Sequence, residues 1–295
     1  MKLSLFFVHL REEKGMEVLK VINNSFVSAY DTEGKEVVIM GKGIGFGTKP
    51  GKKIDEKIIE KIFRIEDSKE GTKFQELLRN LPMEHMRLTS DIIDYAKTKY
   101  GKHLNESIYI ALTDHINFAI ERYHKGMKFV NPLLMEVKQF YKSEYLIGDY
   151  AVQLIKKETG ILFDESEAAS IALHIVNAEY NTKMGEAMKI TTMIQEILDK
   201  VKECFQFRLD EESLHYSRFV SHVKFLCQRI MKKELLNCMD EKIVEMVKEN
   251  YPEEYDCSKK IGSFIHDKYD YEVTNEELMY LAIHIKRMRD ASLEH

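Results

Sequence analysis

An internal duplication in the last two thirds of the chain constrains its fold more than any other sequence feature. When the sequence is laid on itself with an offset of 107 residues, His115 matches His222 and Arg122 matches Arg229, so the string His-x-x-Phe-x-x-x-Arg occurs twice. With an offset of 110 residues the identities continue in the same order, at Tyr145/Tyr255, Ile155/Ile265, Glu167/Glu277, Ala172/Ala282 and His174/His284. A three-residue insertion accounts for the change of offset. We therefore expect two units of about 110 residues, at 72–181 and 182–291, that share one fold.

Each unit carries apolar residues at the spacing of an amphipathic helix. In the first unit Ile108, Leu112, Ile116 and Ala119 recur every three or four residues, and similar stripes continue almost to the end of the chain. Residues at this period share one face of a helix, which then packs against neighbouring helices. The sequence therefore predicts two homologous all-α helical-bundle domains.

Residues 16–65 follow a different pattern, in which short β-rich runs end at turn-forming residues. The runs are Val18 to Ile22, Phe26 to Tyr30 and Val37 to Met40, and the turns are Asn23-Asn24 and Asp31 to Gly34. This pattern predicts a small antiparallel sheet, so the expected fold class is an α+β multidomain protein. About 50 residues with few large apolar groups form a thin core, and we expect dimerisation to stabilise it.

The remaining segments are short. We interpret 1–15 as an N-terminal extension, 66–71 as a polar linker and 292–295 as the remnant of an expression tag. The apolar run from Leu3 to Leu10 is too short to cross a bilayer, and no other segment approaches about 20 apolar residues. The four cysteines lie in the last third of the chain without the spacing of a metal knuckle. We therefore expect a cytoplasmic protein with reduced thiols and no membrane insertion.

The charge balance restricts any nucleic-acid site to a local surface, because the formal net charge is −5. The segment from Gly41 to Lys53 is the strongest local candidate, with four lysines, no acidic residue and five of the 14 glycines of the chain. Glycines let backbone amides approach phosphate, and Phe46 offers a ring for stacking on an unpaired base. The segment does not fit Gly-x-Gly-x-x-Gly, which argues against a dinucleotide site. The alternative is a flexible glycine hairpin with solvated lysines.

Each helical unit has one histidine near its start and one near its end. His115 lies beside the first apolar stripe, and His222 is its counterpart in the second unit. His174 and His284 lie beside Ile171 and Leu281 in the same way. A histidine at the edge of a core, satisfied by a hydrogen bond, is one interpretation. Retention of both positions through the duplication favours a role beyond packing.

Three chemical roles compete for these histidines. A metal site needs three or four converging ligands, and neither unit offers a cysteine or carboxylate at ligand spacing. Acid–base catalysis needs a substrate pocket, and the sequence contains no Gly-rich cradle or nucleophile elbow. Phosphoryl acceptance needs a neutral imidazole nitrogen, and Arg122 and Arg229 follow the first histidine of each unit on the same helical face, as phosphate-partner candidates. Residue chemistry leaves phosphoryl acceptance and the structural role both open.

Taken together, the chain from Met16 to about Ala291 resembles the BglG/SacY/LicT family of transcriptional antiterminators. The co-antiterminator RNA-binding domain of that family begins with Lys-Val-hydrophobic-Asn-Asn-Asn, matched by Lys20 to Asn24, and carries Gly-(Lys/Arg)-Gly-hydrophobic-x-Phe, matched by Gly41 to Phe46. Two regulatory domains called PRDs follow in the family, each with two histidines in the contexts found in this chain. Ser25 stands where relatives often have a third asparagine, and its hydroxyl lacks the paired geometry of an amide.

The resemblance implies which residues carry function. RNA binding falls on Lys20, Asn23, Asn24, Ser25, Gly41, Lys42, Gly43 and Phe46. Phosphorylation falls on His115, His174, His222 and His284. No catalytic residue, metal or cofactor is implied.

The resemblance also implies partners and control. A homodimeric head binds an imperfect hairpin in the leader RNA of a sugar-utilisation transcript and prevents the overlapping terminator from forming. The sugar-specific enzyme II of the phosphotransferase system drives phosphorylation of the first PRD and inactivates the protein. The phosphocarrier protein HPr phosphorylates the second PRD and activates it.

Two rival functions belong to other classes. A DNA-binding activator with the same PRDs needs a helix-turn-helix, whereas residues 16–65 are β-rich. A histidine-metal hydrolase needs a bound metal ion. We therefore predict a transcription regulator and not an enzyme.

Overall fold

The computed structural model describes residues 15–64 except 32, residue 78, and residues 82–105, 107–182, 184–205, 209–236 and 241–293. Three segments interpreted from the sequence lie outside these ranges: the extension at 1–15 apart from Gly15, the linker at 66–71, and the last two residues of 292–295. The chain divides into two compact units, one made of Met1–Pro132 with Ser143–Thr182 and the other of Leu133–Lys142 with Lys183–His295.

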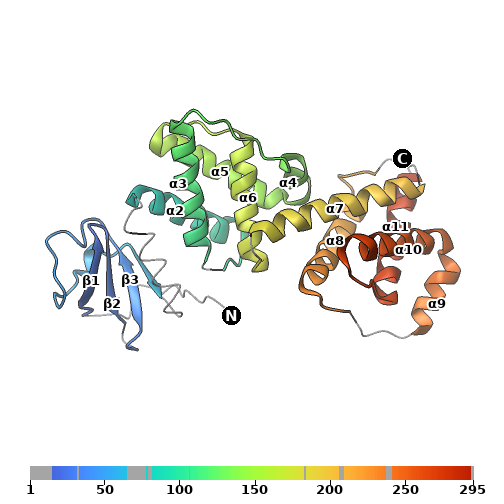
Figure 1. Cartoon of the computed structure of the whole chain (residues 1–295), viewed down its shortest axis with the longest axis horizontal. Coiled ribbons are helices and arrows are strands. Elements are labelled where there is room, and N and C mark those ends of the chain that lie inside the picture. Colours follow the sequence, from blue (N-terminus) through green and yellow to red (C-terminus); the bar gives the residue numbers. More distant parts are fainter. Residues whose placement is uncertain are drawn as a thin grey trace. The chain divides into compact units, whose positions relative to one another are not determined.

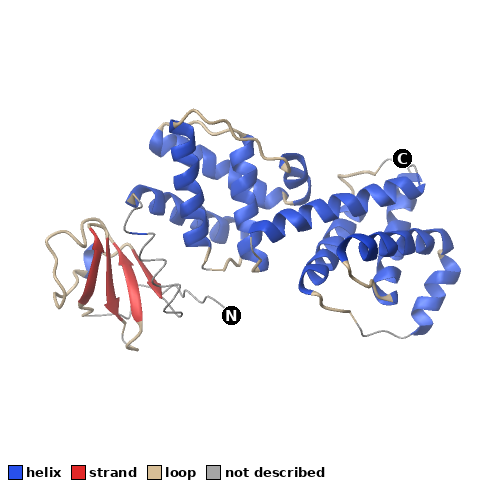
Figure 2. Ribbon diagram, in the orientation of Figure 1, coloured by secondary structure: helices blue, strands red, loops and turns tan. Residues whose placement is uncertain are grey.

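The first unit begins with a four-stranded antiparallel sheet (Figure 2). Its strands, in spatial order, are β1 (Val18–Asn23), β2 (Phe26–Tyr30), β3 (Glu36–Met40) and β4 (Lys61–Arg64), the last preceded by the short 3-10 helix η1 (Glu56–Ile58). The first three strands are those that the sequence predicts. Strand β4 was not among them, because two apolar residues between a lysine and an arginine show no recognisable alternation. Its pairing with β3, where Ile62 lies opposite Ile39, makes it a strand.

The two faces of the sheet bury different side chains, as expected when residues alternate along a strand. On one face Val27, Val37 and Ile39 form a small core with loop residues such as Ile44. On the other face Phe26, Val38, Met40 and Phe63 join the hydrophobic core of the first helices. The helices therefore supply apolar burial that the thin sheet lacks by itself.

Polar contacts tie β4 to the helix that follows it, α2 (Met83–Tyr100). Lys61 is buried, and its Nζ donates to the Ser90 hydroxyl and to Asp94 Oδ1 at 3.3 Å. Arg87 on α2 forms an ion pair with Glu60, just before the strand. A buried lysine with two oxygen partners fixes the position of the strand edge, because the charge is costly to bury without them.

The remaining helices of the first unit are α3 (Ile108–His124), α5 (Lys142–Thr159) and α6 (Glu165–Tyr180). Helix α3 packs against both α2 and α6 (Figure 1). Helix α6 begins at an N-cap, Asp164, whose side chain accepts from the N–H of Ser166 at 2.9 Å. It ends at Asn181, which has a left-handed φ of 52°.

The second unit contains α4 (Leu134–Phe140), α7 (Met184–Phe205), α8 (Leu214–Lys232), α9 (Glu241–Asn250), α10 (Pro252–Tyr269) and α11 (Asn275–Leu293). Helix α8 packs against α7 and α11, and α10 packs against α11 (Figure 1). The α3/α6 pair of the first unit thus has its repeat counterpart in the α8/α11 pair of the second. Over the part of the chain that the structure describes, no helix is long and apolar enough to cross a membrane.

Candidate RNA-binding surface and paired histidines

The two N-terminal motifs meet at one end of the sheet. The turn between β1 and β2 lies against the glycine loop at residues 41–47. The N–H of Gly41 donates to the Ser25 carbonyl oxygen and that of Gly45 to the Asn24 carbonyl oxygen, each at 3.0 Å. The structure therefore assembles one surface from the asparagine turn and the glycine–lysine segment.

Close packing of this loop on the turn and on η1 requires glycine at two positions. A Cβ on Gly45 would lie 1.9 Å from the carbonyl oxygen of Asn23, and a Cβ on Gly41 would lie 2.1 Å from that of Ile58. Both obstacles are backbone atoms, so a side chain would push the loop away from its neighbours. Gly43 is required for a different reason, since its φ is +70°.

Side chains suited to nucleic acid are exposed around this loop. Phe46 is 77% exposed although it is a large apolar residue. Lys20, Asn24 and Lys42 have exposed side chains in the strand, turn and loop. Lys49, Lys52 and Lys53 are exposed further along the segment, where Lys52 and Lys53 lie beside the start of β1. A solvent-facing ring flanked by lysines combines a stacking surface with attraction for phosphate.

Asn23 uses its side chain inside the turn. Its Oδ1 accepts from the N–H of Ser25 at 2.8 Å and from that of Phe26 at 3.0 Å, and its Nδ2 donates to the Leu78 carbonyl oxygen at 2.6 Å. These contacts make Asn23 a shaping residue of the turn.

The first histidine pair lies between α3 and α6. The ring centroids of His115 and His174 are 4.7 Å apart. Burial and the nearby Arg122 charge lower the pKa of His115 to about 4, and burial together with His115 lowers the pKa of His174 well below its usual range. Both rings are therefore neutral at neutral pH, which is the nucleophilic form of imidazole.

Glu167 at the start of α6 joins this pair to the arginine. Its Oε1 accepts from Arg122 Nη2, and its Oε2 lies 3.3 Å from His115 Nε2 without forming a hydrogen bond to it. The glutamate is only 4% exposed. Arg122 and Glu167 also line a cavity of about 620 Å³ together with Lys128 and Phe129.

The second histidine pair lies between α8 and α11 in the same way. The rings of His222 and His284 are stacked with centroids 5.1 Å apart. Burial, His284 and Arg229 lower the pKa of His222 to about 4. Burial, Arg287 and Arg218 lower the pKa of His284.

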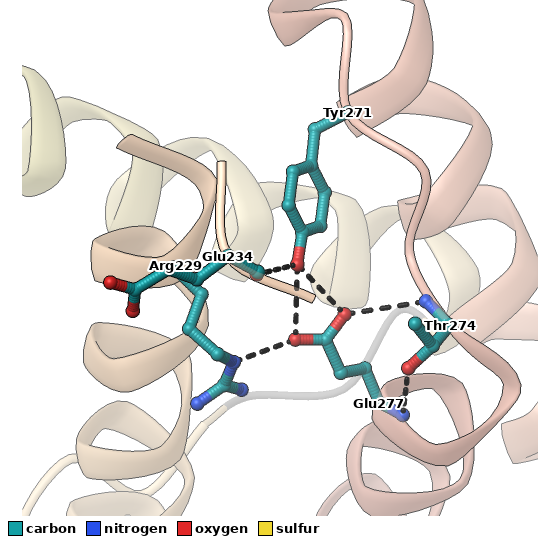
Figure 3. A network of polar contacts seen from close by, with 5 residues as sticks. All are labelled: Arg229, Glu234, Tyr271, Thr274 and Glu277. Carbon is teal, nitrogen blue, oxygen red and sulfur yellow. Dashed lines mark hydrogen bonds and ion pairs between the residues drawn. The ribbon is translucent and has the colours of Figure 1, made fainter. Parts of the chain in front are cut away.

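Glu277 is the counterpart of Glu167, but its surroundings differ (Figure 3). Its Oε1 accepts from Arg229 Nε at 2.8 Å, and its Oε2 accepts from the Thr274 N–H at 3.3 Å. The Tyr271 hydroxyl lies 3.4 to 3.5 Å from the two carboxylate oxygens and also donates to the Glu234 carbonyl oxygen at 2.8 Å. Within the described ranges no ion pair joins Glu277 to His222.

Two nitrogen atoms in the second site have no hydrogen-bond partner in the described structure. They are Nη2 of Arg229 and Nε2 of His222, and both are closed to solvent.

The histidines and arginines that the sequence singles out come together in each unit. The sequence analysis did not single out Glu167, Glu277 or Tyr271 as site residues, although the repeat identity of the two glutamates was a usable signal.

Other candidate metal ligands do not gather into a site. Among the residues that the structure describes, no three or more His, Cys, Asp or Glu side chains are placed to hold a metal ion. Cys204, Cys227 and Cys257 are free thiols. His266 lies 3.0 Å from Glu272 at the exposed end of α10.

Comparison with protein families gives three matches along the chain, to two families. The CAT RNA binding domain matches residues 16–72, and the PRD domain matches twice, at 90–178 and 195–288. Together these matches cover well over half of the sequence, in the order head, first PRD, second PRD.

Similar proteins extend over nearly the whole chain. The transcription antiterminator LicT of Bacillus subtilis is 46% identical over 92% of this chain and 99% of its own length. The beta-glucoside operon antiterminator of Dickeya chrysanthemi is 41% identical over 93% and 97%. A crystal structure of GlcT CAT-PRDI is 38% identical, with a TM-score of 0.50, over 56% of this chain and 98% of that one.

The fold and these matches define a transcription regulator with an RNA-binding head and two regulatory helical domains, not an enzyme. The chain belongs to the family of transcription antiterminators built from a CAT RNA-binding domain and two PRD domains. The family resemblance and the α+β fold class predicted from the sequence are confirmed. The CAT match at the β-rich head contradicts the rival DNA-binding reading.

Proposed function

We propose that this chain works in the cytoplasm as a homodimer that binds a leader-RNA hairpin of a sugar-utilisation operon and prevents terminator formation. The observation that carries the RNA assignment is the single surface formed by the asparagine turn and the glycine loop. Two of the similar proteins are named as antiterminators, one of them for a beta-glucoside operon.

The RNA-binding residues contribute in different ways. Phe46 stacks on an unpaired base, while Lys20 and Lys42 contact phosphate. Asn24 offers an exposed amide for hydrogen bonds to bases. The remaining residues, Asn23, Ser25, Gly41 and Gly43, hold the backbone of the turn and loop in position.

A gel-shift titration of the full chain at fixed salt tests the RNA assignment. Phe46→Ala should weaken binding of the hairpin by about 1–3 kcal/mol. Tyr30→Ala is the matched control, because Tyr30 is another exposed ring on the same domain, outside the loop. Lys42→Ala should weaken binding and reduce the slope of log affinity against log salt concentration by about 1, as expected for the loss of one phosphate contact. Wild-type affinity in Phe46→Ala would rule out stacking.

We further propose that the paired histidines accept phosphoryl groups from the phosphotransferase system. The enzyme II pathway acts on His115 and His174 in the first PRD, and HPr acts on His222 and His284 in the second. The neutral, closely spaced rings beside Arg122 and Arg229 support this role. The arginines are the partners proposed for the added phosphate.

The two PRDs should regulate with opposite sign, and a terminator-reporter assay tests this. In cells lacking HPr, His222→Asp with His284→Asp should raise readthrough, while His115→Asp with His174→Asp should lower it. Aspartate carries one charge of the two that phosphate adds, so partial effects are expected. His266→Asp serves as a control at an exposed histidine of α10. If both pairs of substitutions change readthrough in the same direction, the two PRDs do not regulate with opposite sign.

A further inference from the structure

The two repeats place the same glutamate differently with respect to the histidine that it accompanies. In the first PRD the carboxylate of Glu167 faces His115 Nε2 at 3.3 Å and also holds Arg122. In the second PRD Glu277 is engaged by Arg229, Tyr271 and the Thr274 N–H (Figure 3). Among the residues that the structure describes, its carboxylate forms no ion pair with His222.

We propose that Glu167 is a displaceable carboxylate that phosphate on His115 must expel, whereas Glu277 is a fixed one that leaves Arg229 ready to receive phosphate on His222. The inference rests on the proposed function, since it requires phosphorylation of these histidines. It assigns a positioning role to both glutamates and gives a physical basis for opposite responses of the two PRDs.

The chemistry of transfer shows why the facing carboxylate matters. The lone pair of Nε2 forms the new bond to phosphorus, the donor's bond to phosphorus breaks with its electron pair returning to the donor, and the imidazole keeps its proton on Nδ1. A carboxylate 3.3 Å from Nε2 places a negative charge beside that lone pair and repels the anionic phosphoryl group that approaches it. The resulting phosphate carries about 1.5 to 2 negative charges, by analogy with other phosphorylated side chains, and repels the carboxylate. Glu167 therefore opposes both the reaction and its product.

The first site has the means to release its glutamate. Glu167 and Arg122 line the cavity of about 620 Å³, so the carboxylate has space to move into. Ile161 occupies the position that corresponds to Tyr271 under the offset of 110 residues, so a hydroxyl like that of Tyr271 is missing there. Because the Arg122–Glu167 pair joins α3 to α6, its loss removes a polar tie between those helices.

The second site has the means to accept phosphate without losing a contact. Nε of Arg229 already donates to Glu277, and Nη2 of the same arginine has no hydrogen-bond partner among the described residues. His222 Nε2 is likewise without a partner, and the Arg229 charge is close enough to lower the pKa of that ring. A phosphate on His222 Nε2 therefore adds a charge-assisted contact to Arg229 within α8, while Arg229 keeps its ion pair with Glu277 on α11.

Matched glutamine substitutions test this difference in the full-length protein. Phosphoramidate is used as a small phosphoryl donor, and phosphate on each histidine is followed by mass spectrometry at alkaline pH. Glu167→Gln should raise the initial rate at His115 by about tenfold, because a neutral amide replaces the facing charge. Glu277→Gln should change the rate at His222 much less. Glu158→Gln, at the exposed end of α5, is the control for a lost surface carboxylate.

Each outcome of this experiment has a defined meaning. Acceleration at His115 alone supports the inference. Equal acceleration in both PRDs, or none at His115, overturns it while the proposed function stands. If the wild-type chain accepts phosphate on none of the four histidines, either from phosphoramidate or from phosphorylated HPr, the proposed function fails and the inference fails with it.

A second measurement needs no phosphorylation and also reveals variants that do not fold. His115→Asp places a charge toward Glu167 and should lower the Tm, and adding Glu167→Gln should restore about 2–4 °C of that loss. His222→Asp places its charge toward Arg229, so adding Glu277→Gln should restore nothing. Restoration in both PRDs, or in neither, contradicts the assigned roles.

Discussion

Among the described residues, the first PRD holds its glutamate with an arginine, whereas the second holds the corresponding glutamate with an arginine, a tyrosine hydroxyl and a backbone N–H. In both domains the same histidine pair lies between two equivalent helices. The difference comes from the loop before α6 and α11, where Ile161 corresponds to Tyr271 and Asp164 to Thr274. Two copies of one fold can therefore keep the same reactive groups and still differ in how firmly those groups are held.

The largest effect expected from this comparison is on stability. Glu277→Ala should destabilise the second unit by about 3–5 kcal/mol, because it leaves Arg229 without its buried partner. Glu167→Ala should cost about 1–3 kcal/mol, since Arg122 keeps its position over the Phe129 ring, 4.4 Å from the centroid. Differential scanning calorimetry of the full chain measures both. A larger loss of stability for Glu167→Ala than for Glu277→Ala would contradict this difference between the two PRDs.

The stability of the chain as a function of pH tests a property that the two PRDs share, the lowered pKa of their first histidine. In the folded chain the pKa of His115 and of His222 is lowered to about 4, against an ordinary value of 6.5. The unfolded chain binds more protons below pH 6.5, so stability is complete above that pH and is lost as pH falls from 6.5 toward 4. Each histidine should account for about 3 kcal/mol of this loss.

The control for the titration is substitution by a residue that does not titrate. His115→Asn and His222→Asn should each remove a similar part of the acid-induced loss, as followed by urea unfolding between pH 7 and 4.5. If only one substitution flattens the pH profile, burial does not hold both histidines in the same neutral state.

The smallest expected effect isolates the tyrosine hydroxyl. Tyr271→Phe removes its contacts with Glu277 and with the Glu234 carbonyl oxygen and should cost about 0.5–1.5 kcal/mol. Ile161→Phe, the same ring in the first unit, gains no such contact and serves as a packing control. Tyr271→Phe should also increase the effect of Glu277→Gln on phosphorylation of His222, because the carboxylate is then less firmly held. If Tyr271→Phe does not increase the effect of Glu277→Gln, the Tyr271 hydroxyl does not position Glu277.

The sequence predicted the helical units and the histidine pairs through features that are encoded locally. Apolar residues at the helical period report which face of a helix is buried, and the duplication shows which positions both units retain. The asparagine and glycine motifs likewise indicated residues that meet at one end of the sheet. The sequence did not predict strand β4, because these residues form a strand through their pairing with β3 and not through a pattern of their own.

By itself, the sequence determined the β-sheet head, the repeated helical fold and the placing of His115, His174, His222 and His284 on apolar helix faces, because period and spacing act over a few residues. Only the tertiary structure decided which polar groups lie near the first histidine of each unit, since the glutamate comes from the helix packed against it. Glu167 lies 3.3 Å from His115 Nε2, whereas Glu277 binds Arg229. It also decided that the helices cover one face of the sheet, where Phe63 lies at 5.4 Å from the Tyr109 ring centroid. Contacts of this kind depend on how separate elements pack, and a local pattern of apolar residues does not specify the partner across the interface.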